Sequence, residues 1–477
     1  MSGLGVRAAK GTLWLGLVNL VSKGSQMAIT LVLAAFLTEG ELGLVTLAVA
    51  LVNIGQVIQS MGVYDVVSRT ERDVSAMAGT VLTLSVGTGA ALAAVGVFAA
   101  EPIASALGVP AAAPLVRLAA LSLPFSAAGG VQLGLLHREL DFRRRLLPDA
   151  GSAVAGAVVA IVLAATGAGA ASLAIGLLCT AILQPVLGVV AGVRIRPCWD
   201  PGAAVEAARW IRVVGPAAVV ATLLINVDYP IVARVLGPDA VGVYSLAYRI
   251  AWVPYIMVAI VLGAVAFPVY TRLIRDGRRA ELPAAVGSFT RAALVVVGGL
   301  YVLAALLSDR VVVLDERWRP AAGVLVVLCG YGLGISLLQT WYEAIRAADR
   351  PRWYLVLEVA HLALLVTGLA VLTRHGVLAA AAAQAGAAWA LVPVTAWVLV
   401  RSGVAPPARE LGRVVVSVVV AAVVCSAVRF GLFGAPGSVT SAVFEAVLLL
   451  GCYAGVVLLT QRGLLGELRA LRGEGAR

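Results

Sequence analysis

The chain has 477 residues, of which 61% are hydrophobic and only 13% charged, and its formal net charge is +11 at pH 7. A soluble protein of this length needs far more polar surface to cover its core, so the composition excludes a soluble enzyme and indicates a membrane transporter. The positive charge does not indicate nucleic-acid binding, because the arginines lie in short segments between apolar runs, where the positive-inside rule places them.

Apolar runs recur from the start of the chain to its end. Because a helix needs about 20 mainly apolar residues to cross a bilayer, we predict an all-α fold with about fourteen transmembrane helices. The first run lacks the compact apolar core and cleavage site of a signal peptide, so we expect it to be retained as a helix. The predicted spans are residues 11–37, 42–64, 77–99, 115–136, 149–166, 169–193, 212–236, 240–269, 286–307, 320–345, 353–373, 376–400, 411–430 and 440–461.

Arginine and lysine residues are concentrated in every second segment between the predicted spans. The intervening segments hold little beyond Arg310, Arg317, Arg319 and Arg374. By the positive-inside rule, the arginine-rich segments face the cytoplasm. We therefore predict a multi-pass protein of the bacterial cytoplasmic (inner) membrane with both termini in the cytoplasm.

The segments between the predicted spans are short, and none contains the GxxxxGK[ST] loop that binds nucleotide phosphates. The five cysteines and three histidines show neither a disulfide framework nor metal-ligand spacing. The chain is therefore predicted not to be an enzyme and to use no cofactor and no metal. An ion gradient, the membrane potential or the gradient of the substrate itself must supply the energy.

Residues 33–55 and 232–254 are similar when one is shifted by 199 positions onto the other. The identical pairs include Ala34 and Ala233, Leu37 and Leu236, Gly43 and Gly242, and Leu47-Ala48 and Leu246-Ala247. Each segment joins two helices through a short outside loop, and the two copies have the same orientation because an even number of spans separates them. Parallel repeats of this kind are known in transporters, although two apolar hairpins can also resemble each other by chance. The repeat predicts an N-terminal lobe (1–200), a C-terminal lobe (201–403) of six helices each, and a further helix pair with a cytoplasmic tail (404–477).

Three stretches carry a resemblance to a known family. They are GTLWLGLVNLVSKGSQMAITLVLAAFLTEGELGLVTLA, HRELDFRRRLLPDAGSAVAGAVVAIVLAATGAGAASLAIG and INVDYPIVARVLGPDAVGVYSLAYRIAWVP. Over roughly residues 5–400 the chain resembles the polysaccharide transporters (Wzx-type oligosaccharide flippases) of the multidrug/oligosaccharidyl-lipid/polysaccharide flippase superfamily. The resemblance implies two helical bundles, alternating access, and a polyprenyl-diphosphate-linked oligosaccharide carried from the cytoplasmic to the outer leaflet. The partners it implies are that lipid-linked cargo, membrane lipids, a coupling ion (H+ or Na+) and the polysaccharide-assembly machinery.

Two other classes of function stay open at this point. A relative from the same superfamily could export drugs in exchange for a cation or flip the peptidoglycan precursor, and the shape and charge of its cavity would differ. A polytopic glycan polymerase or ligase should carry a long outside loop with catalytic residues, and the predicted topology has none.

Ionisable residues inside the predicted spans are the first candidates for a substrate-binding cavity, since each is costly against lipid. Lys23 lies midway along the first span and is one of only two lysines in the chain. It could hold a phosphate or a sugar as a point charge, or it could pair with a carboxylate or extend to the interface. Asp228 and Arg249 lie in consecutive spans and could form either a working ion pair that the substrate opens or a static one.

Polar and aromatic residues accompany these charges. Asn226 lies beside Asp228, and Tyr248 precedes Arg249, where aromatic rings could stack on sugars or simply pack together. Asn53 and Gln56 lie on one face of the second span, which could line a wet cavity or contact a neighbouring helix. Glu343 and Arg346 are expected to form an ion network at the inner end of their span, and Gln132 and Gln339 to form hydrogen bonds between helices.

Overall fold

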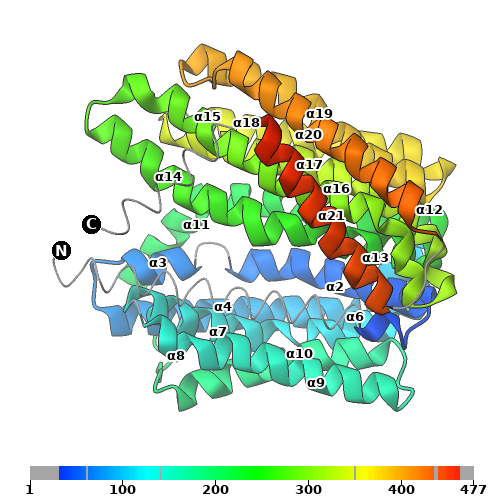
Figure 1. The fold of residues 1–477 in the computed structure, drawn as a ribbon. Coiled ribbons are helices and arrows are strands. Elements are labelled where there is room, and N and C mark those ends of the chain that lie inside the picture. Colours follow the sequence, from blue (N-terminus) through cyan, green and yellow to red (C-terminus); the bar gives the residue numbers. More distant parts are fainter. Residues whose placement is uncertain (1–31, 61–62, 140, 349–350, 435–438, 462–477) are drawn as a thin grey trace. The chain divides into compact units, whose positions relative to one another are not determined.

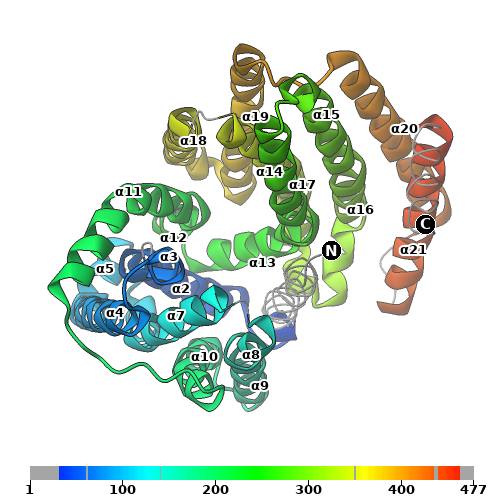
Figure 2. The same ribbon diagram turned by 90° about the vertical axis from the view of Figure 1, so that its left-hand side faces the viewer.

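The computed structural model describes residues 32–60, 63–139, 141–348, 351–434 and 439–461, and all regular structure within these ranges is helical (Figures 1 and 2). Twelve helical segments of this part of the chain are long and apolar enough to cross a membrane, and the bent pair Pro110–Ala120 and Leu123–Arg138 makes thirteen. These thirteen correspond to the second to fourteenth predicted spans, so the all-α membrane fold is confirmed. The predicted first span, 11–37, lies almost wholly outside the described residues, and the count of fourteen stays a prediction.

The chain forms two compact units, up to Leu246 and from Ala247 onward. The helices of unit 1 are α2 (Glu39–Ser60), α3 (Val63–Arg69), α4 (Val74–Phe98), α5 (Ala100–Ala106), η1 (Pro110–Ala112), α6 (Ala113–Ala120), α7 (Leu123–Arg138), α8 (Phe142–Leu146), η2 (Leu147–Gly151), α9 (Ser152–Ala165), α10 (Ala171–Val190), α11 (Pro201–Asn226) and α12 (Asp228–Leu236). Helix α13 (Pro238–Pro254) passes from unit 1 into unit 2. The predicted domain boundaries follow the repeat rather than this packing, and they stay a prediction.

Unit 2 holds the remaining helices. They are η3 (Tyr255–Ala259), α14 (Ile260–Arg275), η4 (Arg279–Glu281), α15 (Leu282–Ala292), η5 (Ala293–Val297), α16 (Gly298–Leu306), η6 (Ser308–Val313), η7 (Glu316–Trp318), α17 (Arg319–Ala347), α18 (Pro351–Leu372), η8 (Thr373–His375), α19 (Val377–Ser402), α20 (Ala408–Leu432) and α21 (Val439–Thr460). The turns η2, η3 and η5 are π-helical, so several spans carry a local widening of the helix.

Small residues allow close contact in the short pair α9 and α10, which lie side by side (Figure 1). A Cβ atom on Gly156 of α9 would overlap the carbonyl oxygen of Gly176, and a Cβ atom on Gly176 would meet the carbonyl oxygen of Gly156. Close approach of helices at glycine is a common way for membrane helices to pack, because lipid supplies little hydrophobic drive between them. By their bounds, α9 and α10 correspond to the predicted spans 149–166 and 169–193.

The starts of α2 and α13 meet at a second glycine contact, which we call the glycine crossing. A Cβ atom on Gly43 would overlap the carbonyl oxygen of Pro238, and a Cβ atom on Gly242 would overlap the carbonyl oxygen of Glu39. One turn further along both helices, the Thr46 hydroxyl lies 3.4 Å from the hydroxyl of Ser245, 199 positions later in the chain. All of these residues belong to unit 1.

The contacts of the glycine crossing are reciprocal. Gly43 and Gly242 are 199 positions apart, and so are the Glu39 and Pro238 residues whose carbonyl groups they contact. A local two-fold axis between two copies of one motif produces this pattern, since each position of one copy then meets the same positions of the other. The crossing therefore supports the repeat predicted from the sequence.

The two copies begin their helices differently. The Thr38 hydroxyl accepts from the Glu41 N–H (3.2 Å), and the Glu41 carboxylate accepts from the Thr38 N–H (2.9 Å), which is the capping box that opens many helices. At the matching place before α13 stands Gly237, with a φ of 86° that a side chain would strain. The capping box and Gly237 thus set where α2 and α13 begin, next to the glycine crossing.

A buried ion network joins the last two helices to the rest of unit 2. Glu445 of α21 is 1% exposed and accepts from Arg429 of α20 and from Arg310 of η6, the latter at 2.7 Å. The Arg429 guanidinium, 3% exposed, also lies 2.7 Å from the carboxylate of Asp309. Two arginines thus share one buried carboxylate, and α20 and α21 are held against the short helix that follows α16.

Candidate functional site

The structure brings the two predicted asparagines together in unit 1. The Asn53 side-chain amide of α2 donates to the Asn226 side-chain oxygen of α11 (3.1 Å), and the Asn226 amide donates to the backbone oxygen of Thr222 (2.9 Å). Gln56 lies about one turn further along α2 and is half-buried. Asn53 thus contacts a neighbouring helix, and whether the polar face of the second span lines a wet cavity stays a prediction.

Asp228 occupies a break between two helices. Helix α11 ends at Asn226 and α12 begins at Asp228, because Pro230 has no N–H to bond the carbonyl of Asn226. The fully buried Asp228 carboxylate accepts from the Tyr229 N–H (3.0 Å) and from the Tyr244 hydroxyl (2.9 Å). An acceptor at the first turn of a helix suits the unpaired N–H groups there, so Asp228 both begins α12 and ties it to α13.

The predicted contact between Asp228 and Arg249 joins a residue of unit 1 to one of unit 2, and it stays a prediction. Arg249 lies half-buried on α13, one residue after Tyr248. Lys23 lies outside the described residues.

We expect Tyr244→Phe to lower the free energy of unfolding by about 1–3 kcal/mol, because it removes the only side-chain donor of the buried Asp228 carboxylate within the described part of the chain. Heating the purified protein in detergent and measuring the fraction that stays monodisperse tests this. Tyr270→Phe, at a buried tyrosine of unit 2 whose hydroxyl has no hydrogen-bond partner among the described residues, is the control. Equal midpoints for Tyr244→Phe and the wild type would contradict the role given to this hydrogen bond.

Tyr248 is part of an aromatic cluster in unit 2. Its ring stacks on that of Trp252 with the centroids 5.2 Å apart, and Trp252 in turn lies 4.4 Å from Tyr255 and 6.1 Å from Tyr331 of α17. Pro254 and the π-helical turn η3 follow directly after Trp252, and both interrupt the regular helix. The rings of Tyr248 and Trp252 both lie 6.1 Å from the ring of Tyr331, and Tyr255 contacts this cluster through Trp252.

A row of polar side chains continues from this cluster along α17. The Tyr255 hydroxyl donates to the Gln339 side-chain oxygen (3.3 Å), the Gln339 amide donates to Glu343 (3.1 Å), and Arg346 donates to the same carboxylate (3.1 Å). The Arg346 guanidinium also lies over the rings of Phe267 (5.2 Å) and Tyr354 (5.6 Å). We call Tyr248, Trp252, Tyr255, Tyr331, Gln339, Glu343 and Arg346 the aromatic–polar row.

The row was only partly foreseeable from the sequence. The Glu343–Arg346 pair forms as expected from its three-residue spacing, and Gln339 makes its expected contact with another helix. Tyr255, which joins the aromatic cluster to Gln339, and Tyr331, which packs on Tyr248 and Trp252, were missed because they lie 76 positions apart. Arg429 and Glu445 were missed as well, although they stand out as ionisable residues within the last two apolar runs.

The chemistry of the row suits a glycosylated ligand. Flat aromatic faces can stack on the apolar faces of sugar rings, and the amide and carboxylate can bond sugar hydroxyls. A guanidinium binds phosphate through paired N–H donors. These groups all come from one unit, so their mutual geometry is set by α13, η3 and α17 alone.

Comparison with known proteins gives the following matches. Residues 32–322 match the model of a family described as polysaccharide biosynthesis protein. The succinoglycan biosynthesis transport protein ExoT of Rhizobium meliloti (strain 1021) is 26% identical over 336 residues, covering 66% of this chain and 67% of that protein. The lipopolysaccharide biosynthesis protein WzxC of Escherichia coli (strain K12) is 23% identical over 340 residues, covering 69% and 67%.

Among solved structures, the lipid II flippase MurJ in an inward closed conformation matches with a TM-score of 0.77. It is 13% identical, and the match covers 95% of this chain and 100% of that one. At that level of identity the likeness concerns the fold. It confirms the class of polytopic helical fold that the resemblance implied.

Proposed function

Because the chain belongs to the polysaccharide biosynthesis protein family, we propose that it is a flippase that moves a polyprenyl-diphosphate-linked oligosaccharide from the cytoplasmic to the outer leaflet. The family match, which spans more than half of the chain, carries this proposal. The relatives are named as a succinoglycan biosynthesis transport protein and a lipopolysaccharide biosynthesis protein. The chain is a multi-pass membrane transporter and not an enzyme.

The cargo has three chemically different parts, which are the polyprenyl tail, the diphosphate and the glycan. The described residues include groups suited to bind the diphosphate and the glycan. The aromatic–polar row supplies stacking faces and hydrogen-bonding groups for the glycan. Arg249, and Lys23 outside the described residues, would bind the diphosphate as fixed positive charges. A flippase must release its cargo into the outer leaflet, so the contacts must be favourable enough for the cargo to enter and weak enough for it to leave. Moderate contacts spread over many groups meet that requirement.

The Asn53–Asn226 hydrogen bond has a place in this mechanism. Each amide still has an unused donor or acceptor while the two are bonded. A sugar hydroxyl that takes the place of one asparagine as hydrogen-bond partner of the other would therefore change the free energy little. A neutral hydrogen bond exchanged for another contributes only about 1 kcal/mol. Gln56, about one turn along α2, would extend the same polar face.

The surroundings of the protein follow from the same proposal. We place it in the bacterial cytoplasmic membrane with both termini in the cytoplasm, as the distribution of arginines favours. A coupling ion, H+ or Na+, and the polysaccharide-assembly machinery are the further partners. A peptidoglycan-precursor flippase is the nearest alternative in chemistry, and the names of the curated relatives favour an exported polysaccharide over it.

We expect Lys23→Gln and Arg249→Gln each to abolish surface polysaccharide in a host that lacks its own copy of the gene, because each removes a positive charge proposed to bind the diphosphate. Surface glycan is measured by immunoblot, and membrane insertion and protein level by detection of a C-terminal tag. Arg374→Gln, at an exposed arginine of η8, is the control and should leave the glycan unchanged.

Normal glycan display in both variants would remove these residues from the mechanism. The transport activity itself is tested with the purified wild type in vesicles that contain a fluorescent lipid-linked oligosaccharide, where exposure of the label to an added quencher reports flipping. Equal exposure of the label in vesicles with and without the protein would refute the proposed function.

A further inference from the structure

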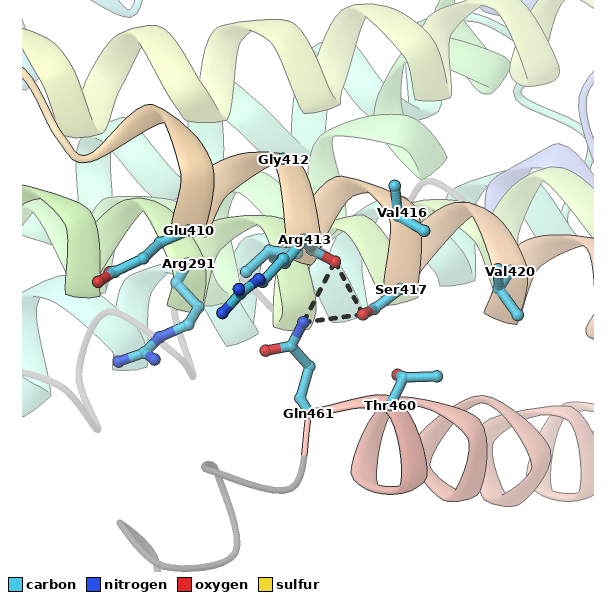
Figure 3. Close-up of a pocket in the computed structure, with 10 residues that line it drawn as sticks. Arg291, Glu410, Gly412, Arg413, Val416, Ser417, Val420, Thr460 and Gln461 are labelled. Atoms are coloured by element: carbon cyan, nitrogen blue, oxygen red, sulfur yellow. Dashed lines mark hydrogen bonds between the residues drawn. The ribbon is translucent and has the colours of Figure 1, made fainter.

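Two pockets of unit 2 differ in the charges that line them. The wider, of about 740 Å³, lies among α15, α20 and α21, and Figure 3 shows the Gln461 amide there bonded to the Arg413 backbone oxygen and the Ser417 hydroxyl. The carboxylate of Glu410 lines it as well, so its lining carries both signs of charge. The smaller, of about 300 Å³, is formed by α18 and α19, and none of the described residues that line it is acidic. We call it the tryptophan pocket.

The tryptophan pocket lies where the start of α18 meets the end of α19, two helices that lie side by side (Figure 2). Trp353 comes from the first turn of α18, and the other lining residues come from the last two turns of α19. The rings of Trp353 and Trp397 meet edge to face with their centroids 6.1 Å apart. Arg401 follows Trp397 by one helical turn, and its guanidinium lies 4.6 Å from the centroid of that ring. All of these residues belong to unit 2.

The positive charge of Arg401 is available to a ligand. The side chain is exposed, and it forms no ion pair with any residue that the structure describes. Its contact with Trp397 uses the flat face of the guanidinium, so the N–H groups at the edge stay able to donate. The two tryptophans are also accessible, 37% exposed at Trp353 and 46% at Trp397.

A buried hydroxyl in the same pocket is without a partner. Ser402 is only 8% exposed, and its Oγ atom has no hydrogen-bond partner among the described residues. Buried polar groups are nearly always hydrogen-bonded, because an unpaired one costs free energy. The Ser402 side chain lines the pocket, so a polar atom of a ligand held there can supply the missing bond.

The side chains of the pocket supply more hydrogen-bond donors than acceptors. Two indole groups and one guanidinium only donate, and the Ser402 hydroxyl is the single side-chain group of the described lining that also accepts. A matching ligand is therefore anionic and rich in acceptor oxygens. The phosphodiester and the ester carbonyl groups of a phospholipid have this character.

The position of the pocket along the two spans suits a lipid. Arg401 belongs to a segment that the distribution of arginines assigns to the cytoplasmic side, and tryptophan is enriched at the interface between membrane and water. One turn deeper on the same faces of the helices lie Val356 of α18 and Val394 of α19, which are both exposed. Basic pockets between transmembrane helices on the cytoplasmic side bind anionic lipid head groups.

We propose that the tryptophan pocket binds an anionic phospholipid of the cytoplasmic leaflet, with its phosphate on Arg401 and Ser402 and its acyl chains along Val356 and Val394. None of these residues belongs to the aromatic–polar row, so the site goes beyond the proposed flippase activity and does not depend on it. A soluble phosphate and the polyprenyl diphosphate of the cargo share the anionic group. The exposed tryptophans and valines beside Arg401 favour a resident bilayer lipid over a soluble anion.

The test counts lipids bound to the purified full-length protein by native mass spectrometry while phosphatidylglycerol or phosphatidylcholine is titrated. We expect saturable binding of phosphatidylglycerol and weak binding of phosphatidylcholine to the wild type. Arg401→Gln and Ser402→Ala should each weaken phosphatidylglycerol binding about fivefold, since each removes one proposed contact of the phosphate. Arg374→Gln removes an exposed arginine at the opposite end of the same two helices, and it should bind as the wild type does.

The proposal is overturned by equal binding of the two lipids to the wild type, or by unchanged binding of phosphatidylglycerol to Arg401→Gln. Displacement by equimolar glycerol phosphate would assign the pocket to a soluble anion. Displacement by equimolar polyprenyl diphosphate, but not by a second anionic phospholipid, would assign it to the cargo. The comparison of lipids on the wild type needs no variant, so poor folding of a variant leaves the proposal open to refutation. Because the readout is binding, loss of transport does not enter it.

Discussion

Gly43→Ala is expected to lower the free energy of unfolding by about 1–3 kcal/mol, although alanine is the better helix former. The added Cβ atom would overlap the carbonyl oxygen of Pro238, and a backbone oxygen at the start of a neighbouring helix cannot move aside as a flexible side chain can. Helices α2 and α13 must therefore separate, which also pulls apart the buried Thr46 and Ser245 hydroxyls. The measurement is the midpoint of thermal unfolding in detergent, together with surface glycan in complemented cells.

Gly242→Ala should behave in the same way, because its Cβ atom would overlap the carbonyl oxygen of Glu39. The double variant should cost less than the sum of the two single ones, since the first substitution already separates the helices and the second uses the space. Gly87→Ala and Gly130→Ala are matched controls, because a Cβ atom at either helical position meets nothing within 4 Å. They should be neutral or slightly stabilising. Unchanged midpoints for both crossing variants would show that the two helices do not meet at these glycines.

Glu445→Gln is expected to cost about 3–5 kcal/mol, because it leaves the Arg429 and Arg310 guanidinium groups without their shared buried carboxylate. Glutamine keeps the size of the side chain and one acceptor, so the loss reports charge and not volume. The largest effect should fall on α20 and α21, and limited proteolysis should cut within these two helices sooner than in the wild type. The exposed pair Arg319 and Glu316 is the control, and Glu316→Gln should make no measurable difference.

Replacing the network should be far milder than breaking it. With Arg310, Arg429 and Glu445 all changed to methionine, the half-exposed Asp309 can be solvated, and no buried charge is left. Buried ion pairs exchanged for apolar residues of similar size are often neutral or stabilising. If the triple variant is as unstable as Glu445→Gln, the network stabilises the protein through the geometry that it gives these helices and not through the compensation of buried charge.

The sequence foretold the spans well and the side-chain contacts unevenly. Hydropathy locates a transmembrane helix because each span must be apolar by itself, whatever its neighbours are. The 199-residue repeat was predicted from matching residues in the two segments, and the contact of Gly43 and Gly242 supports it. Ion pairs three residues apart, such as Glu343 and Arg346, follow from helix geometry alone.

Contacts between helices far apart in the chain were beyond this reasoning. Asn53 and Asn226 were both singled out, but nothing in either segment indicates that they bond to each other. Arg429 and Glu445 each look costly in an apolar span, and only the packing of α20 on α21 shows how the charges are compensated. Tyr244, whose hydroxyl bonds Asp228, lies on the same helix as Arg249. Their distances from Asp228 along the chain therefore could not show which of the two contacts the carboxylate.

The glycine crossing has a consequence for the ancestry of the chain. An interface in which equivalent residues contact each other on both sides is isologous, the kind by which identical subunits dimerise. A half-length precursor with a single copy of the motif would present the same glycine and the same hydroxyl, and two such chains inserted in the same direction would form the contact without any new residue. Fusion of the two genes would then have preserved a dimer interface inside one polypeptide.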